Sequence, residues 1–356
     1  MHLTMIPVTR PYSHWVLIAL SALVSQFAGA QASSGYELSP DTLDYYLIQA
    51  FQAPSVRERI PLNHIGVTVQ KAEGGYRVTA ALEGYPAHQG GIERGDTIVR
   101  VNGEPYHPVY SFNADDTGGL GFTPNPSEYR VEYERLGNLE TVDTVPVFEN
   151  LYDSYRTATL NSMQAFPLGN KTIGYIRFWG LSRATSDLFS LEVAMSGFTN
   201  SDGLIIDLRN SYGYLSSNHL DMFIRNSRVS FTASNDSNSH AAIESSFASS
   251  ANRVFTKPIV VLINAQTRGG AELFAHALSK IGRVTTLGEK SAGEIGPFTV
   301  NEDTVRYLPA DQTLIDGQPF EDVGVAPKQV IAFPYAQGGR SDPQFEAAVD
   351  VLLGRI

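Results

Sequence analysis

The feature of the sequence that most constrains the fold is a change in hydrophobic periodicity near residue 150. Between residues 65 and 147, short runs of β-type residues are separated by glycine and asparagine turn signals. Beyond that point, continuous apolar runs at Gly203–Leu208 and Pro258–Asn264 alternate with helical patterns over Ser182–Phe198 and Ala271–Ile281. Continuous apolar runs that alternate with helices are typical of buried strands in an α/β domain. The sequence therefore predicts a β-rich module followed by an α/β domain.

The start of the chain has the pattern of a secretory leader over residues 1–32. Arg10 precedes an apolar run from Trp15 to Val24, and small residues then offer cleavage after Ala30 or Ala32. The run is about half of the roughly 20 residues that a membrane-spanning helix needs. A cleaved leader is therefore favoured over a membrane anchor. No later segment is apolar enough to span a bilayer, so we expect a secreted or periplasmic protein.

Residues 33–60 are predicted to form an N-terminal helical segment, because apolar residues recur at helical spacing from Leu43 to Phe51. Ser39 is expected to cap this helix, with Pro40 in its first turn. The predicted organisation continues with the β-rich module over residues 61–150 and the α/β domain over residues 151–356.

Composition disfavours several classes of function. The formal net charge is −11 and no long basic or aromatic-interleaved segment is present, so nucleic acid is not an expected partner. The chain has no cysteine, which excludes disulfides, thiolate metal sites and a cysteine nucleophile. No metal-ligand spacing and no glycine-rich phosphate loop is present, so neither a metal nor a cofactor is expected. The sequence does not define the oligomeric state.

Residues 86–103 closely resemble the PDZ pattern of a short helix, a Gly-Asp turn, a strand and an Asn-Gly hairpin. PDZ domains add a C-terminal peptide as a strand to a sheet edge, and backbone amides of a glycine-containing loop receive its carboxylate. The resemblance implies that the amides of Ile65, Gly66 and Val67 form this carboxylate site. The neighbouring His64 is expected to face solvent. The alternative is a β-hairpin module whose turn glycines serve the fold alone.

The α/β half resembles the tail-specific, or C-terminal processing, serine protease family, which includes the retinoid-binding-protein-like and tricorn-core branches. The order and spacing of residues 173–178, 203–213 and 258–293 carry the resemblance, and residues 324–327 are similar to the family's closing segment. With the PDZ-like module, it covers almost the whole chain after residue 32. It implies a polypeptide substrate and a serine in the first turn of a helix, where unpaired backbone amides stabilise developing negative charge.

The residues at the implied catalytic positions depart from the family's pattern. Gly269 stands where the resemblance places the serine, and glycine has no hydroxyl with which to form an acyl-enzyme. Glu294, 25 residues further along, stands where many members carry a lysine base. The resemblance places oxyanion donors at Gly213 and Gly270, for which the alternative is an ordinary turn glycine and helix-start glycine. Tyr214 stands where a second turn glycine is common, and its ring is expected to narrow the cleft.

Two other hydroxyls, those of Thr267 and Ser291, lie close to these positions in the sequence and reach a substrate carbonyl if the backbone is displaced. Two functions therefore remain open. One is an exported endopeptidase of the C-terminal processing type with an unrecognised nucleophile. The other is a non-catalytic protein that holds peptides or small apolar ligands. A loop over residues 110–126, rich in Gly, Asn, Asp and Pro, is expected at the surface.

Overall fold

The structure is a computed structural model that describes residues 35–113, 121–224, 232–234, 240–242, 254–301, 304–335 and 341–356. The leader predicted over residues 1–32 lies outside the described residues, and so do residues 114–120 of the predicted surface loop. Among the residues that are described, no helix has both the length and the apolar character needed to cross a bilayer.

An antiparallel sheet forms the predicted β-rich module, with strand order β3-β4-β5-β7-β8 and β6 paired to β5. Strand β3 is an edge strand, and β4 pairs with it from Val67↔Ala81 to Ala72↔Gly75. The short helix α2 (Pro86–Gln89) falls where the PDZ pattern predicts a helix. The strands are β3 (Val67–Ala72), β4 (Gly75–Ala81), β5 (Thr97–Val101), β6 (Glu104–Pro105), β7 (Tyr129–Arg135) and β8 (Asn138–Thr144).

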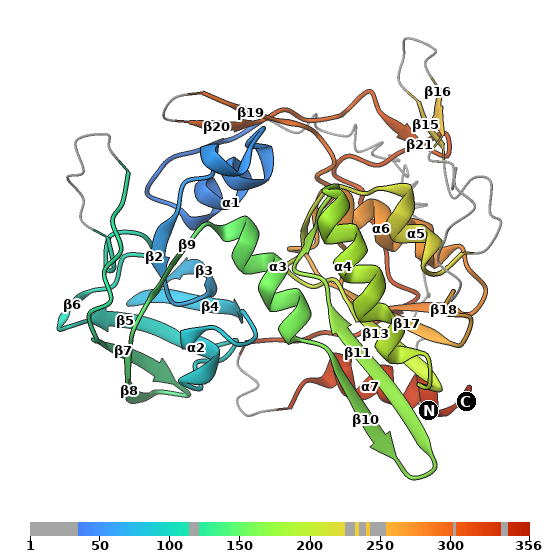
Figure 1. Ribbon diagram of the computed structural model, residues 1–356, viewed down its shortest axis with the longest axis horizontal. Coiled ribbons are helices and arrows are strands. Elements are labelled where there is room, and N and C mark those ends of the chain that lie inside the picture. The colour runs from blue at the N-terminus through green and yellow to red at the C-terminus, as the bar shows by residue number, and fades with distance from the viewer. Residues whose placement is uncertain are drawn as a thin grey trace, which may run out of the picture. The chain divides into compact units, whose positions relative to one another are not determined.

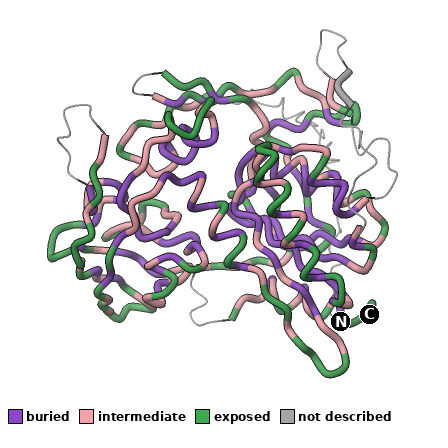
Figure 2. Tube along the Cα trace, in the orientation of Figure 1, coloured by how far each residue is buried: buried purple, intermediate pink, exposed green. Residues whose placement is uncertain are grey.

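A six-stranded sheet forms the centre of the α/β domain, with order β10-β11-β13-β17-β18-β23. All neighbouring pairs are parallel except β10 with β11, whose hairpin carries the exposed tip visible in Figure 2. Every residue of β13, β17 and β18 is buried. The strands are β10 (Gln164–Leu168), β11 (Lys171–Arg177), β13 (Gly203–Asp207), β17 (Ile259–Ile263), β18 (Val284–Gly288) and β23 (Gln329–Val330).

Helices cover both faces of this sheet, which explains the continuous apolar runs in its strands. Helices α4 (Thr185–Met195) and α6 (Gly270–Ser279) pack on the face that includes Ile206 and Val261. Helix α7 (Pro343–Leu353) packs on the opposite face (Figure 1). The α/β class predicted from the sequence is confirmed.

Helix α1 (Leu43–Gln52) is the predicted N-terminal helix, but its capping residue differs from the prediction. Thr42 caps the helix, and its hydroxyl accepts a hydrogen bond from the amide of Tyr45 at 3.3 Å. The prediction of Ser39 is wrong because residues 39–42 close a turn, in which the amide of Thr42 donates to the carbonyl of Ser39.

Short elements complete the described fold. Helix α3 (Leu151–Asn161) begins after the capping residue Asn150 and packs against α1 through aromatic side chains. The remaining elements are β1 (Glu37–Leu38), η1 (Val56–Glu58), β2 (Leu62–His64), β9 (Val147–Glu149), β12 (Gly180–Leu181), η2 (Ser196–Phe198), β14 (Tyr212–Gly213), α5 (Ser217–Asp221), β15 (Thr232–Ser234), β16 (His240–Ala242), β19 (Phe298–Val300), β20 (Val305–Tyr307), β21 (Leu314–Ile315) and β22 (Gln318–Pro319).

Candidate functional site

The start of α6 lies beside two segments that are distant in the sequence. Gly269 is the capping residue of this helix, and its amide donates to the carbonyl oxygen of Glu294 at 2.8 Å. The carbonyl oxygen of Gly213 lies 3.2 Å from the position that a β-carbon at residue 269 would occupy. The structure therefore brings Gly269, Gly213 and Glu294 together.

The space in front of Gly269 is filled by an aromatic ring. A β-carbon at this position would lie 3.2 Å from Cε2 of Tyr212. Tyr212 is buried, and its ring packs edge-on against Phe51, Tyr214 and Phe298 at centroid distances of 5.3, 6.2 and 6.1 Å. Tyr214 thus belongs to an aromatic cluster around position 269 and does not line the main cleft described below.

The two alternative hydroxyls are buried and fully engaged. The hydroxyl of Thr267 donates to the carbonyl of Leu208 at 2.8 Å and accepts from the amide of Asn264 at 3.0 Å. The hydroxyl of Ser291 donates to Glu272 at 2.5 Å and accepts from the amide of Val325 at 2.7 Å. Neither side chain lines the cleft. Both hydroxyls hold the local backbone in place.

Glu272 anchors the loop that carries Glu294. Its carboxylate is completely buried and accepts from the hydroxyl of Ser291, the amide of Gly293 at 2.5 Å and the amide of Glu294 at 2.8 Å. Burial raises the pKa of Glu272 to about 7, although these hydrogen bonds act in the opposite direction. A carboxylate with three donors inside the protein fixes the position of residues 291–294.

The two glycines proposed as oxyanion donors are buried where backbones approach closely. A β-carbon at Gly270 would lie 2.4 Å from the amide nitrogen of Leu215, and one at Gly213 would lie 2.3 Å from the carbonyl oxygen of Leu181. Neither glycine lines the cleft. Close packing therefore explains both glycines without an anion-binding role.

A cleft of about 570 Å³ runs between the edge strand β3, helix α1, the loop before α6 and the loop after β18. The N-terminal segment forms one wall of this cleft, which the sequence analysis did not predict. The hydroxyl of Tyr36 donates to Glu294 Oε2 at 3.0 Å, and Arg268 forms an ion pair with Asp44 at 3.0 Å. The described residues that line the cleft are 38, 41–44, 47, 66–71, 76, 79, 82, 108, 151, 155, 210, 265, 266, 268, 292 and 294.

The loop proposed to receive a carboxylate lies only partly in this cleft. Gly66 and Val67 line it, whereas Ile65 is buried and does not. The amide of Gly66 donates to Nδ1 of His64 at 3.1 Å. The expectation that His64 faces solvent is wrong, because pairing of β2 with β9 places it inside the protein. Burial lowers the pKa of this histidine to about 4.

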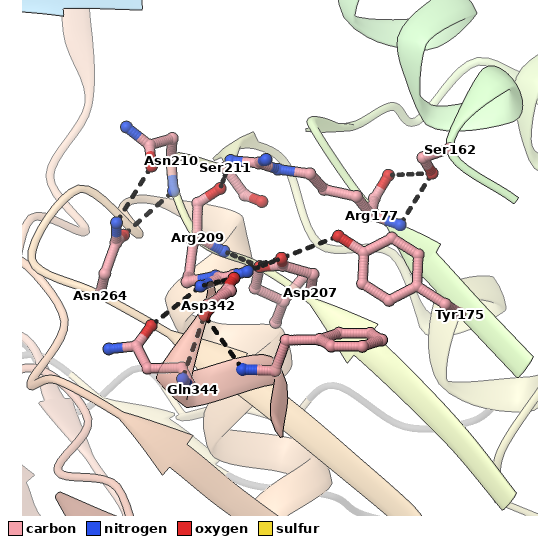
Figure 3. A network of polar contacts seen from close by, with 12 residues as sticks. Ser162, Tyr175, Arg177, Asp207, Arg209, Asn210, Ser211, Asn264, Asp342 and Gln344 are labelled. Atoms are coloured by element: carbon pink, nitrogen blue, oxygen red, sulfur yellow. Dashed lines mark hydrogen bonds and ion pairs between the residues drawn. The ribbon is translucent and has the colours of Figure 1, made fainter. Parts of the chain in front are cut away.

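A buried polar network holds the turn that presents Tyr212 and Gly213 to α6 (Figure 3). Arg209 pairs with Asp207 at 2.6 Å and with Asp342 at 2.7 Å, while the hydroxyl of Tyr175 donates to Asp207 at 2.9 Å. Burial alone would raise the pKa of Asp207, but Arg209 and Arg177 hold it below its ordinary value. The ion pairs therefore fix the chain where it leaves β13.

The same turn is tied to the β-rich module. The amide of Asn210 donates to the side chain of Asn264 at 3.0 Å, and the side chain of Asn264 donates back to Asn210 at 3.0 Å. The side-chain amide of Asn210 also donates to the hydroxyl of Thr79 on β4 at 3.2 Å. This bridge connects the strand next to β3 with the loop that faces the start of α6.

Two segments of the chain match models of known protein families. Residues 172–331 match the model of peptidase family S41, and residues 55–123 match the PDZ domain. The carboxy-terminal processing protease CtpA of Bacillus subtilis is 26% identical over 297 residues, which cover 80% of this chain and 59% of the relative. A carboxyl-terminal-processing protease of Synechocystis is 23% identical over 294 residues, which cover 78% and 65%. The chain thus spans less than two thirds of the length of these relatives.

One solved structure supports the fold independently. A Bacteroides fragilis protein assigned to the S41 proteases superposes with a TM-score of 0.56 at 16% identity, over 83% of this chain and 84% of that chain.

Proposed function

From its peptidase family S41 core and its PDZ domain, we propose that this chain binds extended polypeptides in the cleft between β3 and α6 without cutting them. The observation that carries the proposal is the glycine at position 269. Glycine supplies no hydroxyl, and a β-carbon at this position would lie only 3.2 Å from the ring of Tyr212 and from the carbonyl oxygen of Gly213. A covalent acyl-enzyme needs a nucleophile that reaches the substrate carbonyl, and the family position does not supply one.

Peptide binding is supported by the open edge of β3. Residues 66–71 of this edge line the cleft, so a polypeptide in extended conformation can pair with the strand through backbone hydrogen bonds. Apolar side chains from α1 face the same space, including Leu43 and Leu47. These side chains offer contacts to alternate residues of an added strand.

The proposed ligand class is a polypeptide, and the proposed location is the periplasm or the exterior of the cell. The names of the relatives refer to the processing of carboxyl termini, which makes a polypeptide the first ligand to test. The leader-like pattern of residues 1–32 supports export.

The test is to incubate the purified protein with an unstructured polypeptide that ends in apolar residues, and to follow both binding and fragments. Size-exclusion chromatography measures the complex, and mass spectrometry measures cleavage. We expect a stable complex with intact polypeptide. Fragments that accumulate in proportion to the amount of protein would reject the non-catalytic proposal.

The second candidate is an endopeptidase with an unusual nucleophile, and the processing proteases among the relatives favour it. If fragments accumulate, three variants separate the possibilities. Thr267→Val or Ser291→Ala abolishes cleavage if that hydroxyl attacks the substrate. Gly269→Ala serves as the matched control, because no side-chain chemistry is removed at this position.

A further inference from the structure

We propose that the cleft binds extended polypeptide through its internal residues and does not select a free C-terminal carboxylate, and that His64 is the residue that prevents this selection. The inference rests on the proposed function, because it defines which part of a polypeptide the same cleft takes. It departs from the carboxylate site at residues 65–67 that the PDZ resemblance implies.

The loop before β3 offers few free hydrogen-bond donors to the cleft. A carboxylate that leaves water must be met by several hydrogen-bond donors or by a cation. Of the three implied amides, that of Gly66 already donates to Nδ1 of His64 at 3.1 Å. Ile65 is 1% exposed and lies outside the cleft lining. The amide of Val67, which lines the cleft, is the one implied donor left, and a single amide does not supply the several donors or the cation that a carboxylate needs.

The side chain of His64 is held in place by contacts on several sides. His64 is 3% exposed, and its Nε2 lies 3.1 Å from the hydroxyl of Ser154 on α3. Its ring stacks on Tyr85 with a centroid distance of 5.7 Å and an interplanar angle of 19°. Contacts on both ring nitrogens and one ring face hold the acceptor against the amide of Gly66. A ligand carboxylate would have to displace a side chain that is fixed on three sides.

Carboxylates outnumber cations among the described residues that line the cleft. Among the described lining residues, the cations are Lys71 and Arg268, and the carboxylates are Asp41, Asp44 and Glu294. Arg268 is already paired with Asp44 at 3.0 Å. Lys71 is exposed and five positions along β3 from Gly66. The surplus of carboxylates disfavours a further negative charge.

An internal stretch of polypeptide avoids these costs. Its backbone is neutral and can pair with the outer edge of β3 without a charged receptor. The apolar walls of the cleft, which include Leu43, Leu47 and Val69, suit uncharged side chains at alternate positions. The geometry therefore favours a chain that continues past Gly66 over one that ends there.

The test uses the full chain and a random dodecapeptide library synthesised in two forms, with a free C-terminal carboxylate and with a C-terminal amide. Affinity selection followed by mass spectrometry identifies binders, and fluorescence anisotropy then measures Kd for each binder in both forms. We expect both forms to be enriched, with Kd values within about twofold. Tighter binding of the free carboxylate by tenfold or more would overturn the inference and leave the proposed function standing. No enrichment of either form would overturn both.

Variants of His64 test its role directly. His64→Leu keeps much of the side-chain volume but removes the acceptor, so the amide of Gly66 becomes free. We expect the free carboxylate form to gain about tenfold in affinity over the amide form, the order expected for one hydrogen bond to a charged acceptor. Ser154→Ala is the matched control. It removes the hydrogen bond at Nε2 of His64 and leaves the hydrogen bond from the amide of Gly66 to Nδ1 unchanged.

His64→Ala provides a second variant if the leucine side chain does not fit, and thermal melting verifies that each variant is folded. Equal affinities for the two peptide forms in both folded His64 variants would show that this residue does not prevent selection of a free carboxylate.

Discussion

The backbone amide of Gly269 donates to the carbonyl oxygen of Glu294 at 2.8 Å, so the two positions where a nucleophile and a base are expected meet through the main chain. The side chain of Glu294 instead accepts from the hydroxyl of Tyr36 at 3.0 Å. The two positions at which the sequence resemblance implies a nucleophile and a base are therefore adjacent, and here they form a backbone contact and an attachment point for the N-terminal segment.

The first prediction is that Gly269→Ser does not create efficient peptide cleavage. The backbone here has φ 63° and ψ −134°, a conformation in which a β-carbon costs roughly 1–3 kcal/mol. The new side chain would also meet Tyr212, and Glu294 would not act as the lysine of the family does. We expect a lower free energy of unfolding by about that amount, measured by urea denaturation, and no fragments in mass spectrometry.

Gly269→Ala is the control for this prediction, because it adds the β-carbon without the hydroxyl. The two variants should lose similar stability. Substantial hydrolysis by the serine variant alone would show that position 269 still lies in a working active site.

The second prediction concerns the ion pair between Arg268 and Asp44. Arg268 is 16% exposed, whereas Asp44 is 48% exposed, so Asp44→Asn leaves a largely buried guanidinium without its partner. We expect the free energy of unfolding to fall by roughly 1 kcal/mol, because the buried guanidinium loses its ion-pair partner and keeps only the more general attraction of Glu294. Urea denaturation measures the change.

Asp41→Asn tests whether the loss of any negative charge near the start of α1 lowers the free energy of unfolding. Asp41 also lines the cleft, and its described hydrogen bond is with the neighbouring Ser39. This variant should change stability by less than about 0.5 kcal/mol. Equal losses for the two variants would contradict a specific role for Asp44.

Much of the fold follows from local patterns in the sequence. The predicted strand at Thr97–Val101 has the same bounds in the structure, because β-branched residues between two turn signals define both ends. The helix predicted from Ala271 begins one residue earlier, at Gly270. Such elements are determined by residues close in sequence, and periodicity therefore locates them well.

The cleft could not be predicted in the same way. Tyr36 and Glu294 are 258 residues apart, and no local pattern indicates that they meet. His64 was expected to face solvent, but its burial depends on pairing with β9, more than 80 residues further along. Contacts of this kind depend on tertiary packing, which local propensity does not encode.

The third prediction concerns the pH dependence contributed by Glu272. Its pKa is about 7 in the folded protein and near 4.5 in an unfolded chain, so the folded state binds more protons between these values. The contribution to stability is therefore complete below pH 4.5 and is lost as the pH rises through 7. We expect the stability of the wild type relative to Glu272→Gln to fall by up to about 3 kcal/mol over this range.

Urea denaturation at several pH values measures this difference, and Glu73→Gln at an exposed position is the control. A difference that stays constant with pH would show that the three hydrogen bonds to Glu272 keep its pKa near the ordinary value.

The fourth prediction has the opposite sign and concerns His219 on α5. This histidine is buried, its Nδ1 accepts from the amide of Ser216 at 3.0 Å, and burial lowers its pKa to about 4. Below pH 6.5 the unfolded chain binds the proton more readily, so the contribution to stability is present above pH 6.5 and is lost as the pH falls through 4. We expect the wild type to lose up to about 3 kcal/mol relative to His219→Gln over this range.

Exposed His88→Gln should show no such difference. Glu272 acts in one direction between pH 4.5 and 6.5, and His219 and the buried His64 act in the other, so the stability curve of the wild type alone does not report any one of these groups. Only the differences between wild type and each variant separate the two groups, and a flat difference for His219→Gln would contradict a buried neutral imidazole at this position.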